Sequence, residues 1–368
     1  MNFDSKLCLF ESSVVAADAV VTYHYPCSLA LLPDGRLMAT YSAGWVEPGI
    51  GHRLNGMTSY SEDFGRTWSE PYPLFSDETP PLQDFCDPNL AVIGDKIITF
   101  CQSVPHYASE KERLAKSKDW SRESLDSGKT WSPIKEFVHE HNYFAGMNHK
   151  VIRLSDGSYV RGFSWELNAD NSIDTFGEGD QFYLSCLMRT TDGGQTWIKG
   201  QDVTVVDVRS DDPIPHAIHG AGEPAYVELP DGSLYMLVRT GGTNLYETRS
   251  TDMGQTWESV VPSPLISHNC PADLLKLDTG EIIVIYNDHP KYRSRLCVRL
   301  SADGCRTWSP PKHFAPVGFT EEEAACYPVA ELLPDGSITI VWGQVKGSSG
   351  IDRYKICSAR FTRNWILM

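Results

Sequence analysis

Five copies of one eight-residue pattern limit what this chain can fold into more than any other feature. Each copy has Ser or Thr, Asp two residues later, Gly two residues after that, and a closing Thr-Trp; Cys305 replaces the glycine in the last copy. The copies are SEDFGRTW (61–68), SLDSGKTW (124–131), TTDGGQTW (190–197), STDMGQTW (250–257) and SADGCRTW (301–308). Their first residues are 63, 66, 60 and 51 positions apart. A repeat of this period indicates a fold built from copies of one structural unit.

The residue types in the pattern predict a tight turn between two strands. Asp accepts hydrogen bonds from nearby backbone N–H groups, and Gly takes a positive φ without steric cost. We expect the closing Trp to fill the space between neighbouring sheets. The pattern therefore defines a fold, and we expect it to carry no chemistry of its own.

A second repeat consists of apolar strands that reach Asp-Gly or a similar pair and then resume. Its six copies are LPDGRLM (32–38), VIGDKII (92–98), LSDGSYV (154–160), LPDGSLY (229–235), LDTGEII (277–283) and LPDGSIT (333–339). Such pairs between apolar runs are a strong hairpin signal, and six antiparallel sheets at this spacing favour radial closure. The sequence predicts an all-β, six-bladed β-propeller in one domain, 1–368. A strand near 12–17 is expected to complete the sixth blade, which lacks the Thr-Trp pattern.

Charge and composition restrict the partners. The formal net charge is −16, with 32 Lys and Arg against 48 Asp and Glu, and no dense basic run opposes it. Such a surface repels nucleic acid and anionic membranes, so we expect neither as a partner. The N-terminal residues lack the pattern of a signal peptide and no apolar run is long enough to span a membrane, which predicts a cytoplasmic protein.

The ten cysteines are scattered through strand-like runs without a Cys-x-x-Cys pair. This distribution predicts buried, reduced thiols rather than a disulfide framework or a structural zinc site. No cofactor-binding motif stands out, and we expect no cofactor.

Three segments in successive blades carry residues suited to chemistry on an acidic sugar. They are GAGEPAYVELPDGSLYMLVRT (220–240), YNDHPKYRSRLCVRLSADG (286–304) and ACYPVAELLPDG (325–336). Together with the five copies of the Thr-Trp pattern, which is called the Asp-box in that family, they resemble the sialidase (neuraminidase) superfamily of Asp-box (BNR) repeat proteins. The resemblance extends from about Tyr23 to Phe361. The resemblance implies a glycosidase with its active site at the hub of a propeller.

The resemblance assigns roles to four residues. Tyr327 corresponds to the nucleophile and Glu223 to the carboxylate that polarises it, whereas Arg239 and Arg293 correspond to arginines that hold the sugar carboxylate; Arg295 is the alternative to the latter. Two guanidinium groups suit planar, bidentate recognition of a carboxylate. A tyrosine with a pKa near 10 is a poor nucleophile alone and needs an adjacent base.

The chain departs from the family pattern at two places. The first arginine of the family's triad lies in a Tyr-Arg-Ile-Pro-like segment, where this chain has His24. The acid/base aspartate is expected near 49–52, yet the segment GIGHRLNGM (49–57) has none, and Glu47, His52 and Arg53 are the nearby ionisable residues. A histidine titrates near neutral pH, so His24 or His52 is a candidate replacement, and Arg53 a candidate substrate contact.

Further candidates are expected to line the funnel. FCDPNLAV (85–92) contributes Asp87, and GMNHKVIRLSDGSYVRGFSW (146–165) contributes His149 and Trp165, the latter for stacking on a sugar face. His216 and His219 have a His-x-x-His spacing, but no carboxylate at a defined distance accompanies them, so we expect no metal.

Three functions are compatible with these residues. The first is an exo-acting glycoside hydrolase of sialidase type that binds a small acidic sugar or oligosaccharide. The second is a lyase or atypical glycosidase acting on uronic-acid glycans, with a His/Tyr pair such as His24 and Tyr327 transferring protons. The third is a carbohydrate-binding propeller without catalysis.

Overall fold

A computed structural model describes most of the chain. The described residues are 12–15, 21–47, 51–76, 83–106, 117–138, 144–145, 150–166, 182–205, 219–291, 293, 295–314, 323–346 and 353–368. The side chains of some strand residues in these ranges, His24 and His52 among them, are not described.

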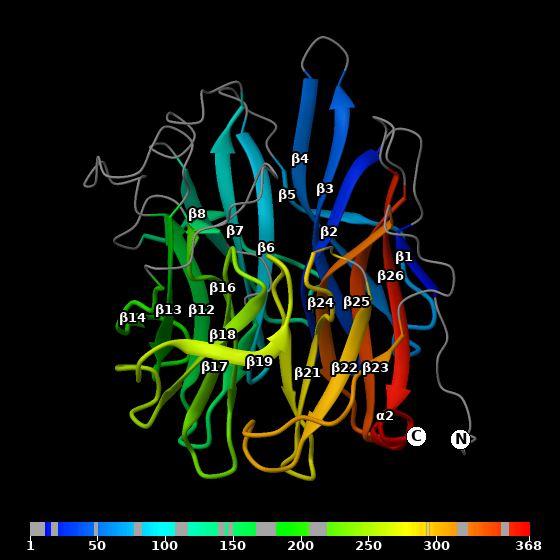
Figure 1. Ribbon diagram of the computed structural model, residues 1–368. Helices are drawn as coiled ribbons and strands as arrows, with labels where there is room; N and C mark the ends of the chain where they lie inside the picture. The colour runs from blue at the N-terminus through cyan, green and yellow to red at the C-terminus, as the bar shows by residue number, and fades with distance from the viewer. Residues whose placement is uncertain are drawn as a thin grey trace.

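Six β-sheets make up the described structure (Figure 1). The first two blades contain β2 (Val21–Leu31), β3 (Leu37–Glu47), β4 (Gly51–Ser61) and β5 (Tyr72–Phe75), then β6 (Gln83–Ile93), β7 (Lys96–Pro105), β8 (Lys118–Ser124) and β9 (Lys135–Glu136). The third contains β10 (Phe144–Ala145), β11 (Val151–Arg153), β12 (Tyr159–Glu166), β13 (Phe182–Thr190), β14 (Ile198–Lys199) and β15 (His219–Gly220).

The fourth and fifth blades contain β16 (Gly222–Glu228), β17 (Leu234–Arg239), β18 (Asn244–Ser250) and β19 (Val261–Ile266), then β20 (Asp273–Lys276), β21 (Ile282–Asn287), β22 (Leu296–Ser301) and β23 (Lys312–His313). The sixth contains β24 (Glu323–Leu332), β25 (Ser337–Lys346), β26 (Arg353–Thr362) and β1 (Ser12–Val15). A short helix, α2 (Arg363–Leu367), follows β26. The predicted six-bladed all-β propeller is confirmed.

The sixth blade joins the two ends of the chain. Strand β1 pairs antiparallel with β26, with Ser12 opposite Ser358. This pairing confirms the expectation that a strand near 12–17 completes the blade. Because the outer edge of the last sheet is covered by the first strand of the chain, the ring closes through backbone hydrogen bonds.

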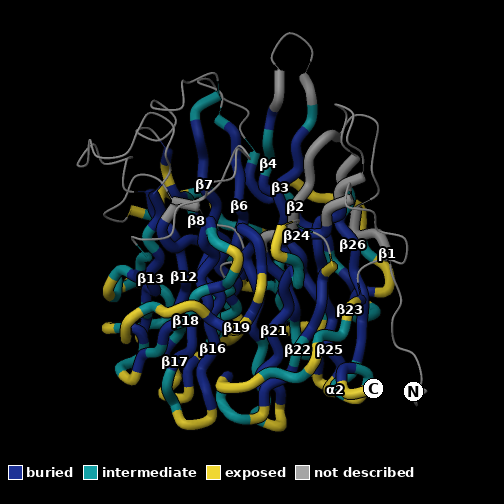
Figure 2. Tube along the Cα trace, in the orientation of Figure 1, coloured by how far each residue is buried: buried dark blue, intermediate teal, exposed yellow. Residues whose placement is uncertain are grey.

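The hydrophobic core lies between neighbouring blades around the ring. Leu237 of blade four and Val284 of blade five share one cluster, and Leu37 of blade one and Val341 of blade six share another. Inner strands such as β16 and β17 are buried along their whole length because both faces of their sheet meet another sheet. Figure 2 shows this burial along the strands and exposure at the turns of the lower end.

The Thr-Trp repeats form the expected turns. In the first copy, Asp63 accepts hydrogen bonds from the backbone N–H (2.8 Å) and the hydroxyl (2.6 Å) of Thr67, and Gly65 has a φ of 90°. Trp68 Nε1 lies 3.1 Å from Ser358 Oγ of blade six. The tryptophan therefore links adjacent blades, as its position in the pattern predicts.

The turns and the candidate site lie at opposite ends of the blades. In blade two, Ile97 pairs with Ser124, so the Thr-Trp repeat that starts at Ser124 lies beside the first hairpin turn. In blade four, Glu223 near the start of β16 and Arg239 at the end of β17 lie at the end of the sheet away from their hairpin turn. This separation supports the prediction that the repeats carry no chemistry.

Two further expectations concern thiols and membranes. The eight cysteines that the structure describes are buried thiols, as their scattered positions predict. Within the described ranges, no helix has both the length and the apolar character required to span a bilayer.

Candidate active site

The site is built on bulges in the innermost strands. In β6, β16 and β24 two consecutive residues face one residue of the neighbouring strand. The first residue of each bulge, Asp87, Glu223 or Tyr327, is followed by proline and has a positive φ of 57°, 45° or 55°. Proline suits these positions because it cannot donate to the ladder. The sequence thus places three candidate site residues at equivalent points of three blades.

A bulge changes the direction of the side chain that it carries, and positive φ is strained for residues other than glycine. The surrounding structure holds two of these bulges through serines of the preceding blade. The Asp87 N–H donates to Ser42 Oγ (2.9 Å), and the Glu223 N–H donates to Ser164 Oγ (2.6 Å). Backbone groups that lose their ladder partner are therefore satisfied, and the strained side chains are held in place.

Arg239 connects the glutamate and the tyrosine. Its Nη1 lies 2.6 Å from Glu223 Oε2 and 3.5 Å from the Tyr327 hydroxyl, and all three side chains are buried. Arg239 is the last residue of β17 and lies opposite Gly222, the first residue of β16, which brings it beside the bulge. The structure thus brings together three residues from two blades that the sequence assigned to one site.

Arg293 approaches the same tyrosine from blade five. Its Nη1 lies 3.3 Å from the Tyr327 hydroxyl, and its guanidinium carbon lies 5.5 Å from the centre of the tyrosine ring. Two guanidinium groups therefore surround one hydroxyl. Arg295, the alternative candidate, is exposed and has a φ of 59°.

Asn269 holds both arginines and was missed by the sequence analysis. Its side-chain oxygen accepts from Arg239 Nε (2.9 Å), and its backbone carbonyl accepts from Arg293 Nη2 (2.9 Å). Like the three bulge residues, it is buried and has a positive φ, here 48°. A signal was present in the sequence: Asn269 lies two residues before Pro271, ahead of the hairpin of blade five.

The electrostatics of the group favour a neutral tyrosine beside firmly charged arginines. Burial raises the pKa of Tyr327 to about 12, and the Glu223 carboxylate adds to the rise, whereas Arg293 and Arg239 oppose it. Burial alone lowers the pKa of Arg239, but Glu223 raises it above its usual value. Tyr327 therefore needs a proton acceptor in order to act as a nucleophile, and the arginines keep their charge for an anionic ligand.

A second charged cluster lies near the start of β6 and contains Arg53. Arg53 Nε lies 3.1 Å from Asp84 Oδ1, and its Nη2 donates to the Gln83 carbonyl (3.0 Å). The other oxygen of Asp84 lies 2.8 Å from His106 Nδ1. Arg53 is 4 % exposed. Its side chain holds the strand ends together, which does not support the predicted substrate contact.

His106 is a second residue that the sequence analysis missed. A carboxylate that orients a histidine ring is a common arrangement for proton transfer. The ring and its partner lie at the same end of blade two as Asp87, because β7 ends at Pro105 and β6 begins at Gln83. Asp84 and His106 are far apart in sequence, and no local pattern joins them.

Trp165 packs in the core. It is 8 % exposed and clusters with Phe163, Cys186 and Met188, and its Nε1 donates to Asp202 (2.8 Å). The ring is occupied by these contacts, so the geometry does not support the predicted stacking on a sugar.

The predicted histidines are placed only in part. His24 lies on β2 opposite Ala43, and His52 lies on β4 opposite Val46, both in blade one. Their side chains, and His149 altogether, lie outside the described residues. Their roles stay predictions.

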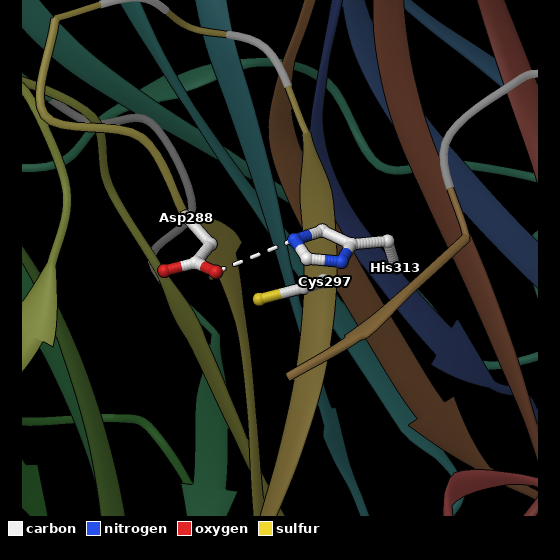
Figure 3. Close-up of side chains that lie close together, drawn as sticks. All are labelled: Asp288, Cys297 and His313. Carbon is white, nitrogen blue, oxygen red and sulfur yellow. Dashed lines mark ion pairs between the residues drawn. The ribbon is translucent and has the colours of Figure 1, made fainter. Parts of the chain in front are cut away.

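Within the described part of the chain, one His/Cys/Asp group has ligand atoms within 4.8 Å of one another, and it lies outside the hub. It consists of Asp288, Cys297 and His313 in blade five (Figure 3). The residues around Tyr327 instead offer charged hydrogen-bond donors, which suit an anionic ligand.

Comparisons with known proteins agree with this architecture. The chain matches the BNR repeat-like domain family over residues 35–340. A sialidase of Micromonospora viridifaciens is 24% identical, over 90% of this chain and 51% of its own length. The chain thus spans about half of that relative.

Two solved structures illustrate the fold. The intramolecular trans-sialidase of Ruminococcus gnavus, in complex with oseltamivir carboxylate, superposes with a TM-score of 0.71 at 14% identity, covering 97% of this chain and 98% of that one. A protein of unknown function from Dyadobacter fermentans gives a TM-score of 0.68 at 18% identity, covering 95% and 99%. The match over residues 35–340, together with the six blades, shows that the chain belongs to the BNR repeat-like domain family and has the β-propeller fold of sialidases.

Proposed function

We propose that the protein is an exo-acting glycoside hydrolase of sialidase type that releases a terminal acidic sugar, sialic acid or a relative. The observation that carries the proposal is the position of the Tyr327 hydroxyl, 3.5 Å from one guanidinium and 3.3 Å from another. One of these guanidinium groups is also paired with the buried Glu223 carboxylate. The contacts among Tyr327, Glu223 and the two arginines support their proposed roles as nucleophile, base and carboxylate-binding groups.

The chemistry follows from the charges. A sugar carboxylate that binds Arg239 and Arg293 competes with Glu223 for Arg239. This competition frees the Glu223 carboxylate to accept a proton. Tyr327 then attacks the anomeric carbon as its proton moves to Glu223, and the bond from that carbon to the leaving-group oxygen breaks. Water subsequently attacks the same carbon, which releases the sugar and returns the proton from Glu223 to Tyr327. A neutral nucleophile avoids the repulsion that a carboxylate nucleophile meets at a carbon bearing a carboxylate, which distinguishes this scheme from the usual pair of carboxylates. The bound ligand of the Ruminococcus gnavus enzyme, named as a carboxylate, supports an anionic substrate.

A proton donor for the departing oxygen is the remaining requirement, and we propose a histidine for this role. His24 and His52 are the candidates from the sequence, and the short contact between His106 and Asp84 supports a third, His106. A general acid matters most when the leaving group is poor. Substitution of the correct histidine by Ala is therefore expected to slow a natural disaccharide much more than a substrate with an activated aryl leaving group.

The first experiment is hydrolysis of a fluorogenic N-acetylneuraminic acid glycoside between pH 5 and pH 8. We expect turnover by the wild type and a loss of at least about a thousandfold in kcat for Tyr327→Phe, because the nucleophilic oxygen is removed. Tyr41→Phe is the matched control: Tyr41 is fully buried in blade one, and its hydroxyl contacts Ser59 Oγ rather than Glu223 or either arginine.

Each result separates the three functions. Turnover that survives Tyr327→Phe rejects the proposed nucleophile. Absence of turnover by the wild type rejects sialidase activity on this substrate, and uronic-acid glycans are then tested for the ultraviolet-absorbing double bond that a lyase creates. Tight binding of an acidic sugar without any turnover indicates a carbohydrate-binding propeller.

A further inference from the structure

A cluster of three potential metal ligands lies in blade five, apart from the residues around Tyr327. Asp288 follows β21, Cys297 lies on β22 and His313 ends β23. One ligand atom from each residue lies within 4.8 Å of the others. Figure 3 shows the carboxylate, the thiol and the imidazole directed toward one another.

The register of the sheet brings these side chains together. Cys297 is paired directly with Tyr286 of β21 on one side and with His313 of β23 on the other. Asp288 lies two residues after Tyr286, and residues two apart along a strand point to the same face of the sheet. Cross-strand partners on one face have Cβ atoms close together. The cluster is therefore set by the backbone of three adjacent strands.

The donor set suits zinc. Zn²⁺ binds thiolate, imidazole and carboxylate at about 2.0–2.3 Å, so tetrahedral ligand atoms lie about 3.3–3.7 Å apart. His313 Nε2 is 3.3 Å from Asp288 Oδ2. The other pairs lie within 4.8 Å, so a movement of about 1 Å by side chains completes the geometry. We propose that Asp288, Cys297 and His313 bind a zinc ion.

The surrounding groups orient the carboxylate for this purpose. Asp288 Oδ1 accepts from the Tyr286 hydroxyl (3.3 Å) and lies 3.6 Å from Arg299 Nη2. Oδ2 faces His313. The two oxygens thus have separate roles: one is held by neighbours, and the other is presented to the ion. Such outer contacts fix ligand orientation in metal sites.

An ion has a path to the cluster from solvent. The His313 side chain is 45 % exposed and that of Asp288 is 18 % exposed, whereas Cys297 is fully buried. Three protein ligands leave a fourth position on the exposed side for water or another small ligand.

A bound ion would link two elements of blade five, the outer strand that carries His313 and the loop that follows Asp288. His313 lies on a strand of two residues, β23. Asp288 donates its N–H to the Arg295 carbonyl (3.1 Å), which closes the loop that carries Arg293. Zinc is therefore expected to raise Tm by about 3–5 °C at saturating concentration. This proposal is independent of the proposed function, since it predicts binding whether or not the chain is a glycosidase.

The test uses the full chain after treatment with a chelator and dialysis. Co²⁺ is added as a spectroscopic substitute, and Zn²⁺ affinity is measured by competition with a chromophoric chelator. The wild type is expected to bind one Co²⁺ per chain with a sulfur-to-cobalt charge-transfer band and strong visible bands, all abolished by one equivalent of Zn²⁺. Cys297→Ser is expected to lose the charge-transfer band, and both Cys297→Ser and His313→Gln to bind Zn²⁺ at least tenfold more weakly. Cys186→Ser, at a fully buried cysteine of blade three, should leave binding unchanged.

Two results overturn the proposal: no charge-transfer band in the wild type, or a band and an affinity that Cys297→Ser and His313→Gln leave unchanged. Far-ultraviolet circular dichroism without metal establishes that each variant is folded. If Cys297→Ser fails to fold, His313→Gln decides alone, because His313 lies on an exposed outer strand and its replacement leaves the core intact.

Discussion

The buried ion pair between Glu223 and Arg239 makes a sharp prediction about stability. Glu223 Oε2 and Arg239 Nη1 lie 2.6 Å apart, and the two side chains are 3% and 4% exposed. At an effective dielectric constant of 20, Coulomb's law gives an attraction of about 6 kcal/mol at this distance, largely offset by the loss of hydration. Removing one partner leaves the other charge buried without compensation, which typically costs about 3–5 kcal/mol.

We therefore expect Glu223→Gln to lower the free energy of unfolding by about 3 kcal/mol, the lower end of that range, because the new amide oxygen still accepts from Arg239. Arg239→Met is expected to cost about 3–5 kcal/mol. The double variant contains neither charge. Its loss in free energy of unfolding should therefore be smaller, by about 2–3 kcal/mol, than the sum of the losses of the two single variants.

The assay is equilibrium unfolding in urea, followed by tryptophan fluorescence. Glu136→Gln is the matched control, because Glu136 Oε2 lies 2.8 Å from Lys118 Nζ but the two side chains are 42% and 50% exposed. Solvent screens that pair, and we expect a change within about 0.5 kcal/mol. The reasoning is refuted if Glu223→Gln is as mild as Glu136→Gln, or if the effects of the two hub substitutions are simply additive.

Two further predictions concern the repeats and the pH dependence of stability. Gly35 and Gly65 both have a left-handed φ, of 87° and 90°, but a Cβ at Gly35 meets nothing within 4 Å, whereas at Gly65 it lies 2.7 Å from Thr339 Cγ2. Gly35→Ala should cost about 1 kcal/mol and Gly65→Ala about 2–4 kcal/mol in urea unfolding; equal costs would argue against close blade contact at the repeat. Burial raises the pKa of Glu331 to about 7, against the opposing charge of Lys150. Because the raised pKa means that the folded chain holds this proton more tightly than the unfolded chain, protonation of Glu331 stabilises the fold. This contribution to stability is complete below pH 4.5, the ordinary pKa of the group, and is lost as the pH rises through about 7. Glu331→Gln should therefore be more stable than the wild type by about 1–3 kcal/mol at pH 8, with no difference at pH 4, and a uniform difference across this range would contradict the assignment.

The local repeats explain how much of the fold the sequence predicts. Each blade is marked by an Asp-Gly-like hairpin, and five carry the Thr-Trp turn, whose hydrogen bonds join residues four apart, as between Asp63 and Thr67. Bonds of such short range are visible in a linear pattern. Even the last copy keeps the turn, with Cys305 at a φ of 62° in place of glycine.

The candidate site was predicted less completely. The family resemblance identified Glu223, Tyr327, Arg239 and Arg293, and the structure brings all four together. It missed Asn269, because an asparagine before a proline carries no chemistry until both arginines are seen to contact it. The catalytic roles of the four residues that the resemblance identified stay predictions.

The direction of a side chain depends on bulges and on the register between distant strands. Only the tertiary structure decided these directions. Trp165 and Arg53 had the right residue types for substrate contacts, yet packing and an ion pair occupy them. Asp288, Cys297 and His313 have no metal-binding spacing in sequence, yet three adjacent strands bring them within 4.8 Å of one another. The sequence by itself determined the six blades, because their signals are local. Only the assembled sheets determined which side chains meet, because those contacts join residues that the chain keeps far apart.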